Sequence, residues 1–361
     1  MVSVVIGTHN RAESLRGTLE SLSGMSVPRE LEWELIVVDN NSSDNTRAVV
    51  EEFAQTSPFE VRYFFETRQG LSHARNTGVA RAAGEIIAFT DDDVTMAPEW
   101  LRELVRAFGK FDCAGVGGKS IPAWGGLTRP KWLALPGPYY LGTGPLLDFN
   151  QGPEAKLIQT PPFGLNMAFR KSVFAKYGLF RADICRAGAG GLLGADTEFG
   201  QRLIRAGEKI AYAPKAIVYH PVPKERLTRS YFLTHQYRLG RGYVRTLELA
   251  SGLVRWFGVP RTYFRSLLES SWRWLVAFRS AEKFYHKAQV WLHLGRIAES
   301  WKLRGEARGD SIAAPASITS GNARAFEATL LAVIEECVAA SGHGSIADAA
   351  DRQEPPERSR D

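Results

Sequence analysis

Cysteine is scarce in this chain, and long apolar runs are missing from it. The 361 residues contain three cysteines, Cys113, Cys185 and Cys337, an odd number without the close spacing of metal ligands. We therefore predict free thiols in a reducing compartment rather than a disulfide framework. No apolar run approaches the roughly 20 residues that span a bilayer, and no basic leader precedes the strand-like run after Met1. These absences favour a cytoplasmic protein.

Acidic residues are scarce in one stretch of the sequence. Residues 224–308 contain 17 Lys/Arg against 6 Asp/Glu, whereas residues 309–361 contain 4 against 9, and residues 1–223 are balanced. The basic stretch could face nucleic acid, an anionic membrane surface or simply water. Because no nucleic-acid recognition motif accompanies the charge, we predict no nucleic-acid partner.

The N-terminal part of the chain alternates between short apolar runs and segments with helical spacing. The runs at 2–6, 35–38, 61–65 and 85–89 are rich in β-branched or aromatic residues. Strands that alternate with helices predict an α/β fold, with βαβ units and a mostly parallel sheet covered by helices on both faces.

The amino-acid composition changes in the later part of the chain. Dense glycines and prolines at 115–164 predict a loop-rich surface. A helix at 196–206 and a strand at 216–220 follow, and helices are expected from 224 to 308. Residues 309–361 are acidic, and we expect them to be largely disordered apart from one helix at 323–339.

Three aspartates, Asp91, Asp92 and Asp93, follow the apolar run that ends at Phe89, with Thr90 between. In open α/β sheets, ligands bind beyond the carboxyl ends of the strands. Crowded carboxylates raise one another's pKa values unless a cation relieves the repulsion. Oxygens from Asp91 and Asp93 suit Mg²⁺ or Mn²⁺, with phosphate oxygens and water completing the shell. The alternative is a solvated acidic turn, the usual fate of so short a run.

Polar residues also follow the first two predicted strands. Thr8, Asn10 and Arg11 follow the first strand, and Asp39 begins a polar cluster after the second. Such side chains can hydrogen-bond a base or a ribose, and they can equally form a turn in which Ser43 or Asp44 caps the next helix. Because three successive strands end in polar residues, the combination predicts one pocket at the carboxyl edge of the sheet.

The ordered motifs resemble those of family-2 glycosyltransferases, which are inverting enzymes with the GT-A fold. The resemblance covers residues 1–223 and is specific, because several motifs occur in order at the expected separations. It implies metal-dependent transfer of a sugar from a nucleoside diphosphate-sugar, with UDP expected, to a saccharide or lipid-linked acceptor. The motifs are Val4–Arg11, Val37–Asp44, Gly70–Gly78, Phe89–Asp93, Gly164–Arg170, Ala195–Leu203 and Tyr219–Pro223.

The resemblance implies a role for each matching residue of the donor site. Asp91 and Asp93 would hold the metal, and Asp92 would contact the ribose or the sugar. Arg75 would lie near the donor phosphates or sugar. His220 matches a histidine that approaches the metal in some members, although a strand-end histidine bonded to backbone is an equal alternative. The residues that would bind the nucleotide are Thr8, Asn10, Arg11 and, at the base, Asp39.

Asp196 matches the catalytic base of the family. Inversion by a single displacement requires a carboxylate that takes the proton of the acceptor hydroxyl, and the glycine-rich stretch 188–194 could carry Asp196 over a bound donor. The alternative is a helix cap. The family usually has Glu-Asp where this chain has Ala195-Asp196, which puts the acceptor in doubt more than the activity. Glu198 is a nearby substitute, although we expect it to face solvent.

The basic stretch 224–308 interleaves arginines with tryptophans, as in Arg255-Trp256 and Trp272-Arg273-Trp274. Such a pattern suits interfacial helices on an anionic membrane and therefore a lipid-linked acceptor. It also fits helices that pack their tryptophans on the catalytic core. The predicted parts are a donor-binding half at 1–115, an acceptor-binding and catalytic half at 116–223, the basic helical segment at 224–308 and the acidic tail at 309–361.

Two rival functions remain beside the glycosyltransferase. A non-catalytic, membrane-associated nucleotide-sugar-binding protein would keep the fold, but the intact Asp91, Asp93 and Asp196 argue against it. A sugar-phosphate nucleotidyltransferase is disfavoured because no glycine-rich, basic phosphate loop follows the first strand.

Overall fold

The computed structural model describes residues 1–184, 194–246 and 254–308. The predicted tail at 309–361, its helix and most of the stretch 188–194 lie outside these ranges, as do Cys185 and Cys337; Cys113 is a buried free thiol. None of the helices in the described ranges is both long and apolar enough to cross a bilayer.

One mixed sheet of nine strands organises the N-terminal part, with the order β3-β2-β1-β4-β8-β6-β9-β5 and with β7 paired to β9. The strands β3, β2, β1 and β4 are parallel to one another, β8 is antiparallel to β4 and β6, and β9 is parallel to β6. The carboxyl ends of β1, β2, β4, β6 and β9 therefore share one edge. The strands are β1 (Val2–Thr8), β2 (Trp33–Asp39), β3 (Glu60–Phe65), β4 (Ile86–Thr90), β5 (Thr95–Met96), β6 (Gly115–Ala123), β7 (Lys156–Ile158), β8 (Asn166–Arg170) and β9 (Ile210–Pro221).

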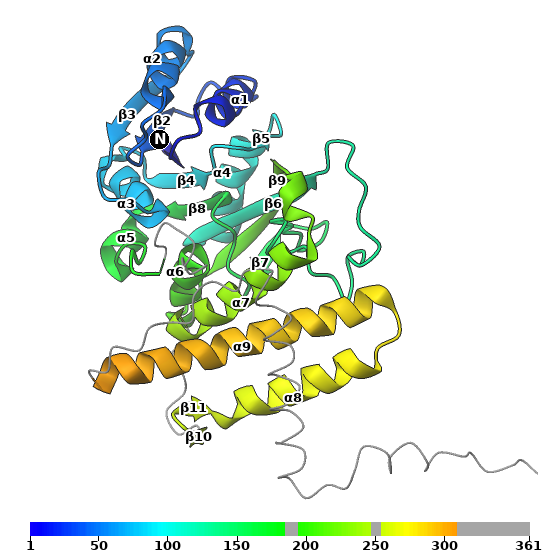
Figure 1. Cartoon of the computed structure of the whole chain (residues 1–361). Helices are drawn as coiled ribbons and strands as arrows, with labels where there is room; N and C mark the ends of the chain where they lie inside the picture. The colour runs from blue at the N-terminus through cyan, green and yellow to red at the C-terminus, as the bar shows by residue number, and fades with distance from the viewer. Residues whose placement is uncertain (185–193, 247–253, 309–361) are drawn as a thin grey trace, which may run out of the picture. The chain divides into compact units, whose positions relative to one another are not determined.

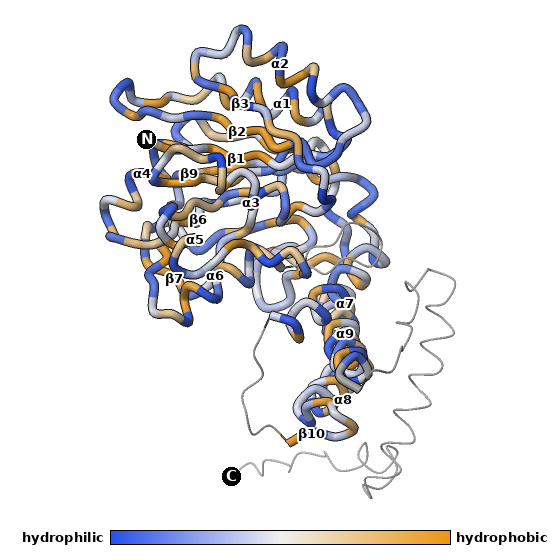
Figure 2. The backbone as a smooth tube through the Cα atoms, turned by 90° about the vertical axis from the view of Figure 1, so that its left-hand side faces the viewer, coloured by the Kyte–Doolittle hydropathy of each residue, from blue (hydrophilic) through white to orange (hydrophobic). Residues whose placement is uncertain are grey.

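Helices cover both faces of this sheet. Val4 and Ile6 of β1 join the core that holds α1, α2 and α4, whereas Val5 joins the core that holds α3, α5 and α6. Successive side chains of a strand point to opposite faces, so a strand buried on both faces is mostly apolar, as the largely orange tube of β1 and β2 shows in Figure 2. The predicted α/β class is confirmed. The helices are α1 (Ala12–Ser23), α2 (Thr46–Thr56), α3 (Leu71–Arg81), α4 (Trp100–Phe111), α5 (Lys171–Tyr177) and α6 (Ala195–Arg205).

The predicted loop-rich stretch at 115–164 is wrong over Gly115–Ala123, which form β6, and over Lys156–Ile158, which form β7. The glycines of β6 are positions of close packing. A Cβ at Gly115 would lie 2.6 Å from the ring of Phe169, and one at Gly117 would lie 2.5 Å from Pro162. Glycine within a strand often marks such a close approach, and glycine density alone does not distinguish it from a loop.

Within the described ranges, three α-helices follow the sheet: α7 (Arg229–Thr246), α8 (Arg261–Val276) and α9 (Ser280–Arg308). The helix α9 lies between α7 and α8 (Figure 1). A short hairpin of β10 (Arg255–Trp256) and β11 (Val259–Pro260) interrupts the predicted helical stretch. Buried Glu299 of α9 accepts hydrogen bonds from Arg241, at 2.7 Å, and Arg245 of α7. Trp132 from the loop before β7 packs edge-on against Phe232 of α7.

Two glycines set the spacing of α7 and α9. A Cβ at Gly240 would lie 2.0 Å from the carbonyl oxygen of Leu292, and one at Gly295 would lie 2.1 Å from that of Tyr237. Because these neighbours are backbone atoms, neither helix can yield locally. The sequence therefore brings the two backbones into direct contact.

Replacing Gly240 by alanine is expected to lower the free energy of unfolding by about 2–3 kcal/mol, because the new methyl group separates two packed helices. Urea denaturation measures the effect. The control is Gly17→Ala in α1, where nothing lies within 4 Å of a new Cβ; that variant should be more stable by about 0.5–1 kcal/mol. Equal stability of Gly240→Ala and wild type would contradict the packing described above.

Candidate active site

The three aspartates follow β4 at the carboxyl edge of the sheet, and they do not form a solvated turn. Asp92 is buried. Arg11, which follows β1, donates hydrogen bonds to Asp92 at 3.1 Å and to Asp93 at 2.8 Å. The parallel pairing of β1 with β4 brings these residues together. Two motifs that are 80 residues or more apart in sequence therefore meet in one cluster.

The carboxylates of the triplet differ in their electrostatic surroundings. Burial raises the pKa of Asp91 to about 6, the two aspartates that follow add to the increase, and Arg75 at 3.4 Å opposes it. Burial also acts on Asp93, but His220 and then Arg11 outweigh it and lower the pKa of Asp93. Asp91 is therefore the carboxylate whose negative charge is least compensated, which is the situation that a bound cation relieves.

His220 lies near the end of β9, which is parallel to β6 and pairs with β5 just after the triplet. Its Nε2 lies 3.5 Å from Asp93 Oδ1, and its buried Nδ1 has no hydrogen-bond partner. The alternative of a backbone-bonded histidine is therefore wrong. The buried hydroxyl of Thr8 faces Asp92 and opposes the increase in the pKa of that carboxylate. Buried polar atoms are nearly always hydrogen-bonded in folded proteins, so the unpartnered Nδ1 of His220 beside this cluster supports a ligand-binding position.

Asp39 is buried at the end of β2. Its Oδ1 accepts the N–H of Ser42 at 2.8 Å, and its Oδ2 accepts the hydroxyl of Tyr63 at 2.8 Å. Ser42 begins the loop that faces the end of β1, where its hydroxyl accepts the N–H of Asn10 at 2.9 Å. Asp39 therefore shapes the loop after β2 that Asn10 contacts, and a direct contact of Asp39 with the base stays a prediction.

The rest of the polar cluster closes on itself, as the turn alternative predicted. Asn10 has a positive φ of 52°, and its side-chain oxygen accepts the N–H of Ser43 at 2.7 Å. Asp44 accepts the N–H of Thr46 at 3.1 Å, at the start of α2, and that of Ala12 at 3.1 Å, at the start of α1. One aspartate therefore serves two helix N-termini, of which sequence order suggested only the nearer.

Asn40 positions a loop that sequence reasoning did not single out. Its amide nitrogen donates to the carbonyl of Arg68 at 2.7 Å, and its oxygen accepts the N–H of Gly70 at 2.7 Å. This loop leads directly into α3, which carries Arg75. Asn40 therefore fixes the start of that helix. The sequence Val-Val-Asp-Asn shows that polar residues follow a strand. It does not show which of them hydrogen-bond to the protein's own backbone.

Gly164 lies between the two groups of candidate residues, and the sequence motif that contains it assigned it no role. Its N–H donates to Asp196 Oδ2 at 2.7 Å. A Cβ at this position would lie 2.1 Å from Nη2 of Arg75, which is itself 3.4 Å from Asp91 Oδ1. Gly164 therefore contacts both the candidate base, Asp196, and the arginine that pairs with the candidate metal ligand Asp91.

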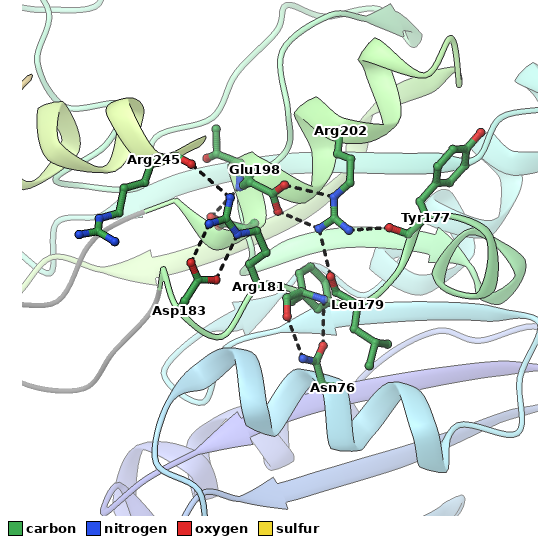
Figure 3. A network of polar contacts seen from close by, with 11 residues as sticks. Asn76, Tyr177, Leu179, Arg181, Asp183, Glu198, Arg202 and Arg245 are labelled. Atoms are coloured by element: carbon green, nitrogen blue, oxygen red, sulfur yellow. Dashed lines mark hydrogen bonds and ion pairs between the residues drawn. The ribbon is translucent and has the colours of Figure 1, made fainter. Parts of the chain in front are cut away.

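A network of polar contacts holds α6, the helix whose first turn carries Asp196 (Figure 3). Glu198 accepts two hydrogen bonds from Arg202, at 3.1 and 2.8 Å. Arg202 also donates to the carbonyls of Tyr177 and Leu179. The prediction that Glu198 faces solvent is wrong, because its carboxylate is buried against the arginine one turn later.

Ala195 is buried and packs against Ile184. A glutamate in its place would put a carboxylate into this apolar contact, at a cost that favours its exclusion. The alanine at this position is therefore accounted for by its contact with Ile184. Asn76 of α3 holds the chain four residues before Ile184, donating to the carbonyl of Phe180 at 2.9 Å and accepting its N–H at 3.0 Å (Figure 3).

Comparison with known proteins gives three informative relatives. The succinoglycan biosynthesis protein ExoM of Rhizobium meliloti is 30% identical over 254 residues, covering 70% of this chain and 77% of that protein. A glucosyl-dolichyl phosphate glucuronosyltransferase of Haloferax volcanii is 29% identical over 224 residues, or 61% and 68% of the two chains. A mannosyltransferase of Pyrobaculum calidifontis, solved with GDP-Man and Mn²⁺, superposes with a TM-score of 0.50 at 21% identity, covering 98% and 88%.

The family model described as Glycosyl transferase family 2 matches residues 3–178. This range contains β1 to β8 with the polar strand ends and Gly164, and ExoM extends the similarity further along the chain. The mixed sheet with helices on both faces is the GT-A fold. This chain belongs to glycosyl transferase family 2.

Proposed function

We propose that this enzyme transfers a sugar, with inversion, from a nucleoside diphosphate-sugar to an acceptor hydroxyl of a growing polysaccharide or glycolipid. We propose a UDP-linked donor. The observation that carries the proposal is the contact chain from Asp91 through Arg75 and Gly164 to Asp196 at one edge of the sheet. A named succinoglycan biosynthesis protein and a transferase acting on a dolichyl phosphate-linked sugar, both relatives, support this class of acceptor.

Asp91 and Asp93 are the residues that would hold Mg²⁺ or Mn²⁺, with His220 beside them. Carboxylate oxygens suit these hard ions, which commonly bind one or two carboxylates together with substrate phosphates. Among the residues with described positions, no three acidic, histidine or cysteine side chains form a metal cluster by themselves, so the donor phosphates would complete the shell. When bound, the ion neutralises the charge that develops on the leaving diphosphate.

The other residues bind the donor and move the proton. We propose that residues 1–115 bind the donor and that residues 116–223 bind the acceptor and carry the base. Arg11 and Arg75, now paired with the triplet, are the cations available to the donor phosphates. Asp196 takes the proton of the acceptor hydroxyl. At the same time the oxygen of that hydroxyl attacks the anomeric carbon, and the nucleoside diphosphate leaves. The amide of Gly164 orients that carboxylate.

The experiment is calorimetric titration with UDP-, GDP-, CDP- and dTDP-sugars in the presence of Mn²⁺, with and without a chelator. We expect one nucleotide class to bind, and the chelator or Asp91→Asn combined with Asp93→Asn to weaken binding by roughly 100-fold, because metal–phosphate contacts contribute several kcal/mol. The control is Asp112→Asn, an exposed aspartate after α4. Donor binding that ignores both metal and variant would refute the metal role.

We also propose that the basic segment 224–308 meets an anionic membrane surface. Such a position would suit a lipid-linked acceptor, whose sugar lies at the bilayer surface. The arginine content of the segment supports this proposal. Its hydrophobic cluster also packs the segment against the loop before β7, through Leu133, Leu141 and Phe232, so the two alternatives for this segment are compatible.

A further inference from the structure

The helix α8 is apolar on its outer side as well as on the side that packs inward. Leu268, Trp272, Leu275 and Val276 are exposed, and their spacing of three and four residues places them on one stripe of the helix. The helix ends at Val276, and Phe278 just beyond it is 100% exposed. The residues buried on the opposite side of α8 are Tyr263, Leu267, Ser270 and Ser271.

Cations lie at both ends of this stripe. Arg261 and Arg265 are exposed on the same side of α8, one turn apart near its start, and Arg279 is exposed after its end. The guanidinium of Arg261 lies 5.5 Å from the ring centroid of Trp256. Trp256 and Phe257 form the exposed tip of the β10–β11 hairpin that precedes α8, and Phe257 is 78% exposed. We call the exposed residues at 256–257, 261, 265, 268, 272, 275, 276, 278 and 279 the outer strip.

A pocket of about 410 Å³ adjoins the C-terminal end of the outer strip. Phe278, Arg279, Arg273 and Tyr139 line it, together with Glu282, whose carboxylate accepts the hydroxyl of Tyr139 at 3.0 Å. Apolar and cationic groups therefore lie at the same edge, where the one carboxylate is already hydrogen-bonded. This arrangement matches a phospholipid, which presents a phosphate directly above its apolar chains.

The charge of the outer strip discriminates between its possible occupants. The strip contains no carboxylate, and Glu269 at its margin is already paired with Arg273 at 2.6 Å. In a symmetric dimer through this surface, the arginines of one copy would face either apolar side chains or the arginines of the other, without compensation. An anionic bilayer surface supplies both the negative charge and the apolar phase.

We propose that the outer strip docks on an anionic phospholipid bilayer, with α8 parallel to the membrane surface. Trp272, Leu275 and Phe278 enter the boundary between headgroups and acyl chains, and Arg261, Arg265 and Arg279 contact lipid phosphates. A 16-residue helix offers a contact line about 24 Å long. The inference specifies the surface for the membrane contact proposed above, and its test requires no turnover.

The test is co-sedimentation of the full chain with vesicles of phosphatidylcholine containing about 30 mol% phosphatidylglycerol, against vesicles of phosphatidylcholine alone. We expect binding that requires the anionic lipid and weakens as salt increases. Trp272→Ser combined with Phe278→Ser should weaken it roughly 10-fold or more, since each side chain loses its apolar burial. The matched control is Phe65→Ser combined with Leu157→Ser, because these exposed apolar residues lie on β3 and β7, away from α8.

A second pair of variants tests the charge. Arg261→Gln combined with Arg265→Gln should weaken binding to anionic vesicles roughly 20-fold, because each arginine near a charged surface contributes about a factor of five. Arg102→Gln combined with Arg106→Gln removes the same charge from exposed positions on α4 and should have little effect. An equal loss in both pairs would mean that net charge alone drives binding, which would overturn the assignment to α8.

Three further outcomes overturn the proposal: no vesicle binding by the wild type, equal binding to both kinds of vesicle, or unchanged binding of the Trp272→Ser/Phe278→Ser variant. A concentration-dependent dimer that this variant abolishes, without vesicle binding, would assign the outer strip to a second copy instead. Calorimetric titration of the same variants with the donor and Mn²⁺ should give wild-type affinity. A variant that loses vesicle binding but keeps donor binding therefore tests only the outer strip. A wild-type protein that binds no donor would contradict only the proposed function.

Discussion

Replacing Asp196 by asparagine is expected to lower kcat for sugar transfer by about 10³-fold while donor binding is retained. The asparagine side chain keeps an oxygen that can accept the N–H of Gly164, a contact of 2.7 Å, so the geometry of the segment survives. It cannot take the proton of the acceptor hydroxyl. Steady-state kinetics with saturating donor, combined with donor titration, measures both quantities.

The matched control is Asp183→Asn, because this carboxylate lies close to α6 in sequence but is paired with Arg181 at 2.6 Å on the surface (Figure 3). Its kcat should stay within a factor of about two of wild type, since exposed ion pairs contribute little. If Asp196→Asn keeps wild-type kcat, Asp196 is only a residue of the first helical turn, and the base must be sought elsewhere.

Replacing Gly164 by alanine is expected to lower kcat/KM by about 100-fold, because it disturbs the donor and acceptor sides together. The new Cβ would lie 2.1 Å from Arg75 Nη2. Arg75 is buried and packs near the ring of Phe180, so its guanidinium can move only by leaving Asp91. A displacement of about 1 Å is enough for losses of this size. Kinetics with both substrates varied checks the result, and Gly109→Ala in α4, where a Cβ meets nothing within 4 Å, is the control.

A stability measurement separates the functional effect of Gly164→Ala from a structural one. The overpacked variant should unfold about 1–3 kcal/mol more easily than wild type. Adding Arg75→Ala removes the clash and should restore part of this stability without restoring activity. A Gly164→Ala enzyme with full activity would show that the contact between Arg75 and Gly164 has no catalytic importance.

The sheet could be predicted from sequence where strands are buried on both faces. Runs such as those around Val4 and Val37 are apolar throughout, because alternate residues enter the two cores. The same reasoning failed at β6, where glycines serve close packing against Phe169 and Pro162. It also missed the β10–β11 hairpin, because two-residue strands carry no periodicity.

The candidate site could be predicted as a set of residues but not as a set of contacts. Arg11 and the triplet come together because β1 and β4 are parallel neighbours, which strand order implies. The roles of Asn40 and Gly164 depend on backbone hydrogen bonds and on the space around a missing Cβ. Neither property leaves a pattern in one sequence. The pair of Glu198 with Arg202, one helical turn later, is readable from the sequence. Its burial is not, because only folding brings the carbonyls of Tyr177 and Leu179 to Arg202.

Turnover of the donor in the absence of acceptor tests the proposed enzyme most directly. Many transferases hydrolyse a bound donor slowly, so the nucleotide-sugar that binds with Mn²⁺ should be converted to nucleoside diphosphate and free sugar. We predict that this hydrolysis stops on addition of a chelator and is lost in Asp196→Asn, because the same carboxylate activates water in place of the acceptor. Intact donor binding without turnover of any donor, with or without candidate acceptors, would contradict it and identify a binding protein that keeps the fold.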